Sequence, residues 1–136
     1  MGYTFYSYLI MLSDNSDATL EKLKNMLEDI YSKDDRNIKI SLDQNCITLT
    51  IDNWNLYIGY SSESHVINES REISEQFAEG MPEQSTIAKC KARFEMSANP
   101  DPDMSFFNDS CFVQERIESF NEVFIFDTNE STFTNI

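Results

Sequence analysis

The chain has 136 residues, 40% of them hydrophobic and 12% aromatic, with only three glycines and three prolines. This composition indicates one ordered globular domain covering residues 1–136 and excludes an intrinsically disordered chain. The formal net charge of −14, from 24 acidic and 10 basic residues, repels nucleic-acid phosphates and anionic membrane surfaces, so direct binding to either is not expected.

The first predicted strand covers residues 3 to 12, where apolar or aromatic side chains occupy both alternating faces. Such a strand lies inside a sheet that is covered on both sides. The turn-forming sequence SDNSD follows, and Leu20, Leu23, Leu27 and Ile30 then recur at helical spacing. This pattern predicts a helix through ATLEKLKNMLEDIYSK.

Three short alternating runs come next, at residues 38–42, 47–51 and 54–60. They are separated by DQN and by DN, whose residues tolerate the positive φ of tight turns. The three runs therefore predict an antiparallel meander. A second helix is expected at about residues 64–79, because apolar side chains follow helical spacing there and Gly80 supplies the stop.

Residues 86 to 98 show the clearest alternation, which predicts a strand with one buried and one exposed face. The exposed face holds Lys89, Lys91 and Arg93. We interpret these as ordinary basic residues of an exposed strand, neutralised by a nearby acidic helix or by cross-strand carboxylates. A phosphate site is the alternative, but a chain with three glycines lacks a glycine-rich phosphate loop.

The segment NPDPDMSFFND leads into a third predicted helix, which extends to about Phe120, and VFIFD then predicts a deeply buried last strand. The elements follow in the order β-α-β-β-β-α-β-α-β. This order predicts an α+β fold with a single-layer mixed, largely antiparallel sheet of about six strands and three helices.

Three aspartates crowd this segment, and calcium binding is one interpretation. An EF-hand loop that starts at Asp101 gains Asp103 and Asp109 as further ligands. It fails at Phe106, where the loop needs glycine, and at Phe112, where it needs a bidentate glutamate. In a second interpretation, Asp101 or Asp103 caps the following helix.

Capping needs only one of the three acids. The surplus suggests an exposed acidic lip formed by Asp101, Asp103 and Asp109 beside Phe106 and Phe107, one of which lacks a place in the core. Acidic groups around an aromatic anchor suit a basic partner.

The second helix carries the other acidic feature, a stripe of Glu69, Glu72, Glu75 and Glu79 that faces away from the apolar side. The stripe is either a solvated helix face or an anionic surface for a basic protein. His65, the single histidine, lies one turn before Glu69 and could form a catalytic pair with it. No nucleophile motif accompanies that pair.

The three cysteines, Cys46, Cys90 and Cys111, show no metal-ligand spacing, and we interpret each as a small buried hydrophobe. We expect no cofactor and no metal. The N-terminal stretch lacks a basic region ahead of its short apolar run, so we expect no signal peptide and a cytoplasmic location.

These patterns favour a non-enzymatic protein-binding module. In size, acidity and absence of a catalytic signature the chain is similar to small cytoplasmic binding proteins, among them the immunity proteins that neutralise bacterial toxins. The resemblance is one of composition and implies a basic protein partner, which the four glutamates and three aspartates would contact. The alternative is an enzyme or small-molecule binder with a site around His65 and Glu69. The oligomeric state and the partner's identity stay open.

Overall fold

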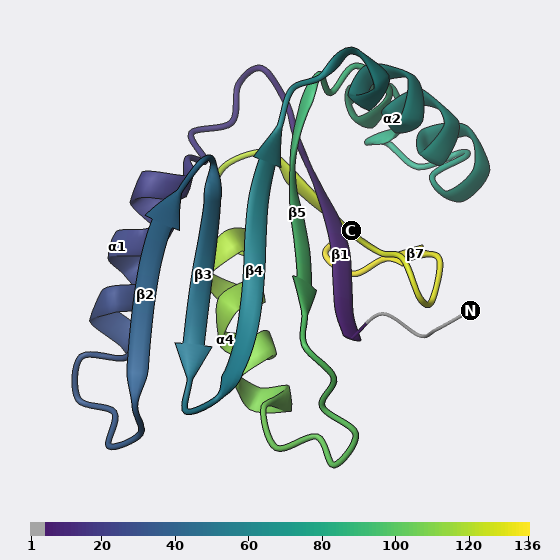
Figure 1. Ribbon diagram of the computed structural model, residues 1–136. Coiled ribbons are helices and arrows are strands. Elements are labelled where there is room, and N and C mark those ends of the chain that lie inside the picture. Colours follow the sequence, from purple (N-terminus) through teal and green to yellow (C-terminus); the bar gives the residue numbers. More distant parts are fainter. Residues whose placement is uncertain (1–4) are drawn as a thin grey trace.

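An antiparallel sheet forms the centre of the computed structural model, which describes residues 5–136. The seven strands found in this range lie in the order β2-β3-β4-β5-β1-β6-β7 (Figure 1). The strands are β1 (Phe5–Leu12), β2 (Ile38–Asp43), β3 (Cys46–Ile51), β4 (Trp54–Ser61), β5 (Ala92–Ala98), β6 (Val123–Asp127) and β7 (Thr132–Phe133). The helices are α1 (Leu20–Ile30), α2 (Ser64–Phe77), α3 (Gln84–Ala88) and α4 (Phe107–Glu118).

The predicted α+β class and the largely antiparallel sheet are confirmed, and every strand pair within residues 5–136 is antiparallel. The structure adds two short elements, α3 and β7, to the predicted order. The first strand is interior, since β1 pairs with both β5 and β6. Residues 3 and 4 of the expected strand lie outside the described residues.

The meander of β2, β3 and β4 follows from its turn residues. Gln44 and Asn45 adopt φ of 49° and 60°, and Asp52 adopts 55°, which is the backbone geometry that two-residue hairpin turns require. Both hairpins keep a regular register, with Ile38 opposite Ile51 in the first. The apolar residues of all three strands therefore face the same way.

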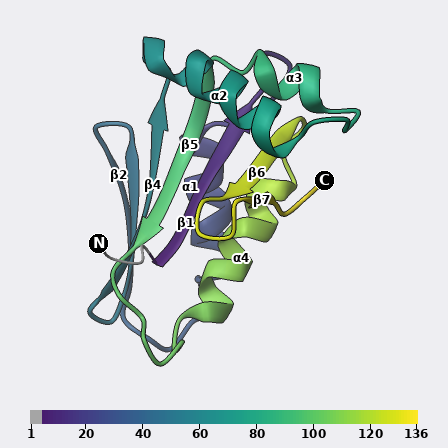
Figure 2. The same ribbon diagram turned by 90° about the vertical axis from the view of Figure 1, so that its right-hand side faces the viewer.

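Alternation along the strands gives the sheet two different faces. On the first face, α1 and α4 cover side chains such as Ile47 and Leu49, which are fully buried. On the second face, Met11 and Phe124 are buried in a smaller apolar cluster that also contains Ile87. Figure 2 shows α2 and α3 across one end of the sheet and α4 along its other side.

The prediction of one strand over residues 86–98 is wrong in its first half. The chain forms α3 there, and β5 begins only at Ala92. The backbone N–H of Ile87 donates to Glu83 O at 3.0 Å, and that of Cys90 donates to Ile87 O at 3.1 Å. Both side chains are fully buried, and their spacing of one helical turn lets α3 and the turn that follows it bury them on the same side.

The second and third predicted helices are confirmed with small changes at their ends. α2 ends at Phe77, so Glu79 lies beyond it, and Gly80 has the positive φ of 82° that a stop after a helix often uses. In α4 the buried side is formed by Val113 and Ile117, and Phe120 is buried just after the helix.

Candidate functional site

The acidic stripe of α2 is on the outside of the helix. Its inner side packs through Val66, Ser70 and Ser74, all fully buried, and the small serines allow the helix to lie close to its neighbours. The glutamates of the opposite side, Glu72 and Glu75, are exposed.

Glu79, just past the helix, is also exposed. Among the described residues no ion pair includes Glu72, Glu75 or Glu79, and Arg71, the arginine of α2, forms none either. These three carboxylates are therefore available to another molecule.

Glu69 has a different role from the other three glutamates. Its Oε1 accepts a hydrogen bond from Arg93 Nη1 at 2.7 Å, and Arg93 Nε donates to Glu95 Oε2 at 2.8 Å. The Arg93 side chain is only 6% exposed, between α2 and the sheet. The predicted neutralisation by an acidic helix is thus confirmed at Arg93. The predicted exposed strand face is wrong, because Arg93 is buried and Lys89 and Lys91 lie before β5 begins.

Two of the three predicted lip aspartates are buried, and Asp101 is the first. Its side chain is 2% exposed. Asp101 Oδ2 accepts a hydrogen bond from Tyr6 Oη at 2.6 Å and one from the backbone N–H of Phe106 at 2.9 Å. Asp101 therefore links β1 to the approach of α4, which is a structural role related to the expected capping.

Asp109 is the second buried aspartate, at 3% exposure. It accepts a hydrogen bond from Tyr31 Oη at 2.7 Å and two from the Arg36 guanidinium at 2.9 and 3.0 Å. Burial, followed by the hydrogen bond to Asp109, raises the pKa of Tyr31 well above its usual value. Hydrogen bonds from Arg36 hold the pKa of Asp34 at about 2.

The expected exposed lip is therefore wrong for Asp101 and Asp109, because both carboxylates are used inside the fold. Asp103 is exposed, and hydrogen bonds from Ser105 lower its pKa. One phenylalanine does lack a place in the core, since Phe107 is 43% exposed.

The other phenylalanine of the pair, Phe106, stacks on Trp54 with ring centroids 4.5 Å apart. In residues 5–136 no group of three or more histidine, cysteine or acidic side chains is placed to hold a metal ion.

The glutamate stripe and the aspartate segment lie at opposite ends of β5. Glu69 meets Arg93 near the start of this strand, whereas the aspartate segment follows its last residue, Ala98. A seven-residue strand spans about 20 Å, and Figure 1 shows α2 at the top and the loop after β5 at the bottom. The two predicted binding segments do not form one continuous surface.

The alternative site around His65 and Glu69 gains no support from the geometry. His65 is exposed in the first turn of α2, and the Glu69 carboxylate is already bound to Arg93. Burial raises the pKa of the Cys46 thiol, and raises that of Cys90 to about 12, so neither of these two thiols is activated as a nucleophile. Cys90 is buried as expected, while Cys46 and Cys111 are half-buried.

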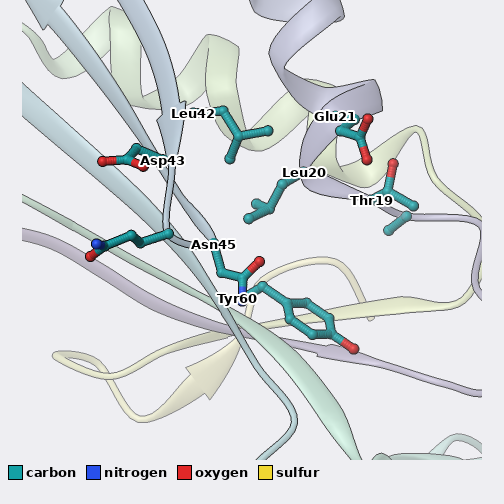
Figure 3. A pocket seen from close by; sticks show the side chains of 9 residues that line it. Thr19, Leu20, Glu21, Leu42, Asp43, Asn45 and Tyr60 are labelled. Carbon is teal, nitrogen blue, oxygen red and sulfur yellow. The ribbon is translucent and has the colours of Figure 1, made fainter.

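Sequence analysis missed an open hollow of about 540 Å³ beside the start of α1. It lies between the first turn of α1, the β2–β3 turn and the end of β4 (Figure 3). Its lining residues are Ala18, Thr19, Leu20, Glu21, Leu42, Asp43, Gln44, Asn45 and Tyr60. Alternation assigns Tyr60 to the buried side of its strand, but Tyr60 lies at the strand end and is 39% exposed.

The side chains of the hollow divide into an apolar floor and a polar rim. Leu20, Leu42 and the Tyr60 ring face one another across the floor, and Glu21 lies at the rim (Figure 3). The Asp43 carboxylate points away from the hollow (Figure 3).

No helix in the described part of the chain has both the length and the apolar character needed to cross a bilayer. Comparison of the sequence with protein-family models and with curated proteins, and of the fold with solved structures, found no match.

Proposed function

We propose that the protein is a non-enzymatic protein-binding module, of the inhibitor or immunity type, that binds a basic protein partner through the outer side of α2. The observation that carries this proposal is the set of three exposed glutamates, Glu72, Glu75 and Glu79, none of which forms an ion pair within residues 5–136. A surface of this kind attracts a partner of opposite charge and speeds the encounter.

Burial and ion pairing limit which acidic side chains a partner can contact. Asp109 and Glu69 are paired with Arg36 and Arg93, which also pair with Asp34 and Glu95. Each group of one arginine and two carboxylates therefore keeps a single negative charge. In the aspartate segment, Asp103 and Phe107 are exposed and remain accessible to a partner. Because that segment lies at the far end of the sheet, the proposal does not depend on it.

The test compares two variants that lose the same charge. In the first, Glu72, Glu75 and Glu79 are changed to glutamine. In the matched control, three exposed acids that form no ion pair within residues 5–136, Glu115, Glu118 and Glu130, are changed to glutamine. Both variants have a net charge of −11, which follows from −14 by removal of three negative charges.

Each tagged variant is used to capture proteins from cells of the native host at low ionic strength. We expect the native protein and the control to retain a basic protein that the α2 variant loses, and we expect the binding to weaken steeply with added salt because exposed charges are screened. Equal capture by both variants, capture that is indifferent to salt, or no basic protein at all would contradict the proposal.

A further inference from the structure

We propose that the hollow between α1, the β2–β3 turn and Tyr60 receives a lysine or arginine side chain of the basic partner. This inference rests on the proposed function and names the contact that would fix the partner's position. Long basic side chains combine an apolar stem with a charged end, and the hollow offers surfaces for both.

The floor of the hollow fits the stem. Leu20 is 8% exposed and Leu42 is half-buried, so both show part of their apolar surface at the hollow. The Tyr60 ring, which is 39% exposed, closes the floor on the side of β4 (Figure 3). Burial of a CH₂ chain against such surfaces is favourable, and the ring face also attracts a cation.

The rim fits the charged end because Glu21 forms no ion pair within residues 5–136. Two lysines lie close to it in the sequence, yet both are engaged elsewhere. Lys22 Nζ donates to the backbone oxygen of Asp17 at 3.1 Å, and Lys24 Nζ pairs with Glu28 at 2.9 Å. A partner's ammonium or guanidinium group would supply the missing counter-charge.

The start of a helix ordinarily attracts anions, but α1 already has a capping side chain and an acidic residue in its first turn. The Thr19 side chain accepts a hydrogen bond from the backbone N–H of Lys22 at 3.1 Å, and Glu21 adds a negative charge beside it. An anionic ligand would meet the Glu21 carboxylate and a protein of net charge −14. The local and the global charge therefore both favour a cation.

Two further observations place the hollow on a larger binding surface. A second hollow, lined by Glu21, Lys24, Asn25 and Leu42, adjoins the first along α1, and its lysine is paired with Glu28. Tyr60 also lies near the end of β4, from which the chain continues directly into α2. One partner can therefore reach the hollow and the acidic side of α2 at the same end of the sheet (Figure 1).

The experiment uses amino-acid amides as probes, so it does not need the partner. The ¹⁵N-labelled protein is titrated with Nα-acetyl-argininamide and Nα-acetyl-lysinamide, and Nα-acetyl-norleucinamide serves as a control with a similar stem and no charge. We expect saturable shifts of the backbone amide signals of Glu21, Asn45 and Tyr60, with dissociation constants in the millimolar range. The norleucine probe should bind several-fold more weakly.

A matched pair of variants tests whether the Glu21 carboxylate binds the charged end of the probe. Glu21→Gln should weaken the binding of the arginine probe by about fivefold, as for a partly solvated ion pair. Glu115→Gln, which removes an exposed charge from α4, should leave the binding unchanged. No saturable shifts at the hollow, equal binding of norleucine, or full binding by Glu21→Gln would overturn the inference.

The two proposals fail in different ways. If a salt-sensitive basic partner is captured through α2 but the probes do not bind the hollow, this inference fails and the proposed function stands. If the arginine probe binds the hollow but no basic partner is recovered, the hollow is a cation site and the proposed function fails.

Discussion

The exchange of Asp109 for alanine tests the role that the structure gives to this aspartate. Sequence analysis placed Asp103 and Asp109 in one acidic lip, whereas the structure buries Asp109 and leaves Asp103 exposed. We therefore expect Asp109→Ala to destabilise the fold strongly. The same exchange at Asp103, a few residues earlier in the chain, should leave the stability unchanged.

The contacts of Asp109 set the size of the effect. Without the carboxylate, the hydroxyl of Tyr31, a residue only 5% exposed, loses its acceptor, which costs about 2 kcal/mol. Arg36 loses two hydrogen bonds but keeps Asp34, and its side chain is 35% exposed, so its share is discounted to about 1 kcal/mol. The sum is a loss of about 3 kcal/mol in the free energy of unfolding.

Urea unfolding followed by circular dichroism measures this loss. With a slope of about 2 kcal/mol per M for a chain of this size, the midpoint of Asp109→Ala should fall by about 1.5 M. Asp109→Asn keeps an oxygen for the Tyr31 hydroxyl and should lose only about half as much. Similar midpoints for Asp109→Ala and Asp103→Ala would refute the assignment of Asp109 to the interior.

Three further results are expected. Glu69→Gln should cost about 1 kcal/mol because it weakens a half-exposed ion pair with the buried Arg93, whereas Glu72→Gln should leave the urea midpoint unchanged; equal effects would contradict the pairing. Phe106→Ala should shift the fluorescence emission of the single tryptophan to longer wavelength and cost about 2 kcal/mol, because it removes the ring stacked on the indole. The Cys90 thiol ionises near pH 9.0 when unfolded and near 12 when folded, so the free energy of unfolding should fall by about 1.4 kcal/mol per pH unit in this window. Tyr31 and Cys46, whose pKa values are also raised, add to the alkaline fall, so Cys90→Ala should reduce the slope by the share of Cys90, and an unchanged slope would contradict the burial of the thiol.

The sequence predicted the elements whose patterns are local. The spacing of Leu20, Leu23 and Leu27 predicted α1, and the turn residues around Gln44 predicted the first hairpin. The split of residues 86–98 into α3 and β5 was missed, since Cys90 continues the alternating run backwards from Ala92 while Ile87, three residues before Cys90, fits only the helical turn. Short apolar runs of this kind do not distinguish the two structures.

The candidate sites depend on contacts between residues that are far apart in the chain. Asp101 meets a tyrosine 95 residues away, and Asp109 meets one 78 residues away. No pattern within NPDPDMSFFND separates these two buried carboxylates from the exposed Asp103. The hollow was missed for a similar reason, because it forms only when Leu20, Leu42 and Tyr60 are brought together by three different elements.

The distribution of the few basic residues decides which acidic surface stays open. The chain has 10 lysines and arginines for 24 acids, and the fold places Arg36 and Arg93 against Asp109 and Glu69, where they hold elements together. Arg36 and Arg93 therefore cannot neutralise Glu21 at the rim of the hollow or the glutamates of α2, where Arg71 is the one lysine or arginine of the helix. An engineered cation would test this, since Gln76→Lys on α2 should reduce the capture of a basic partner by adding positive charge without removing any carboxylate.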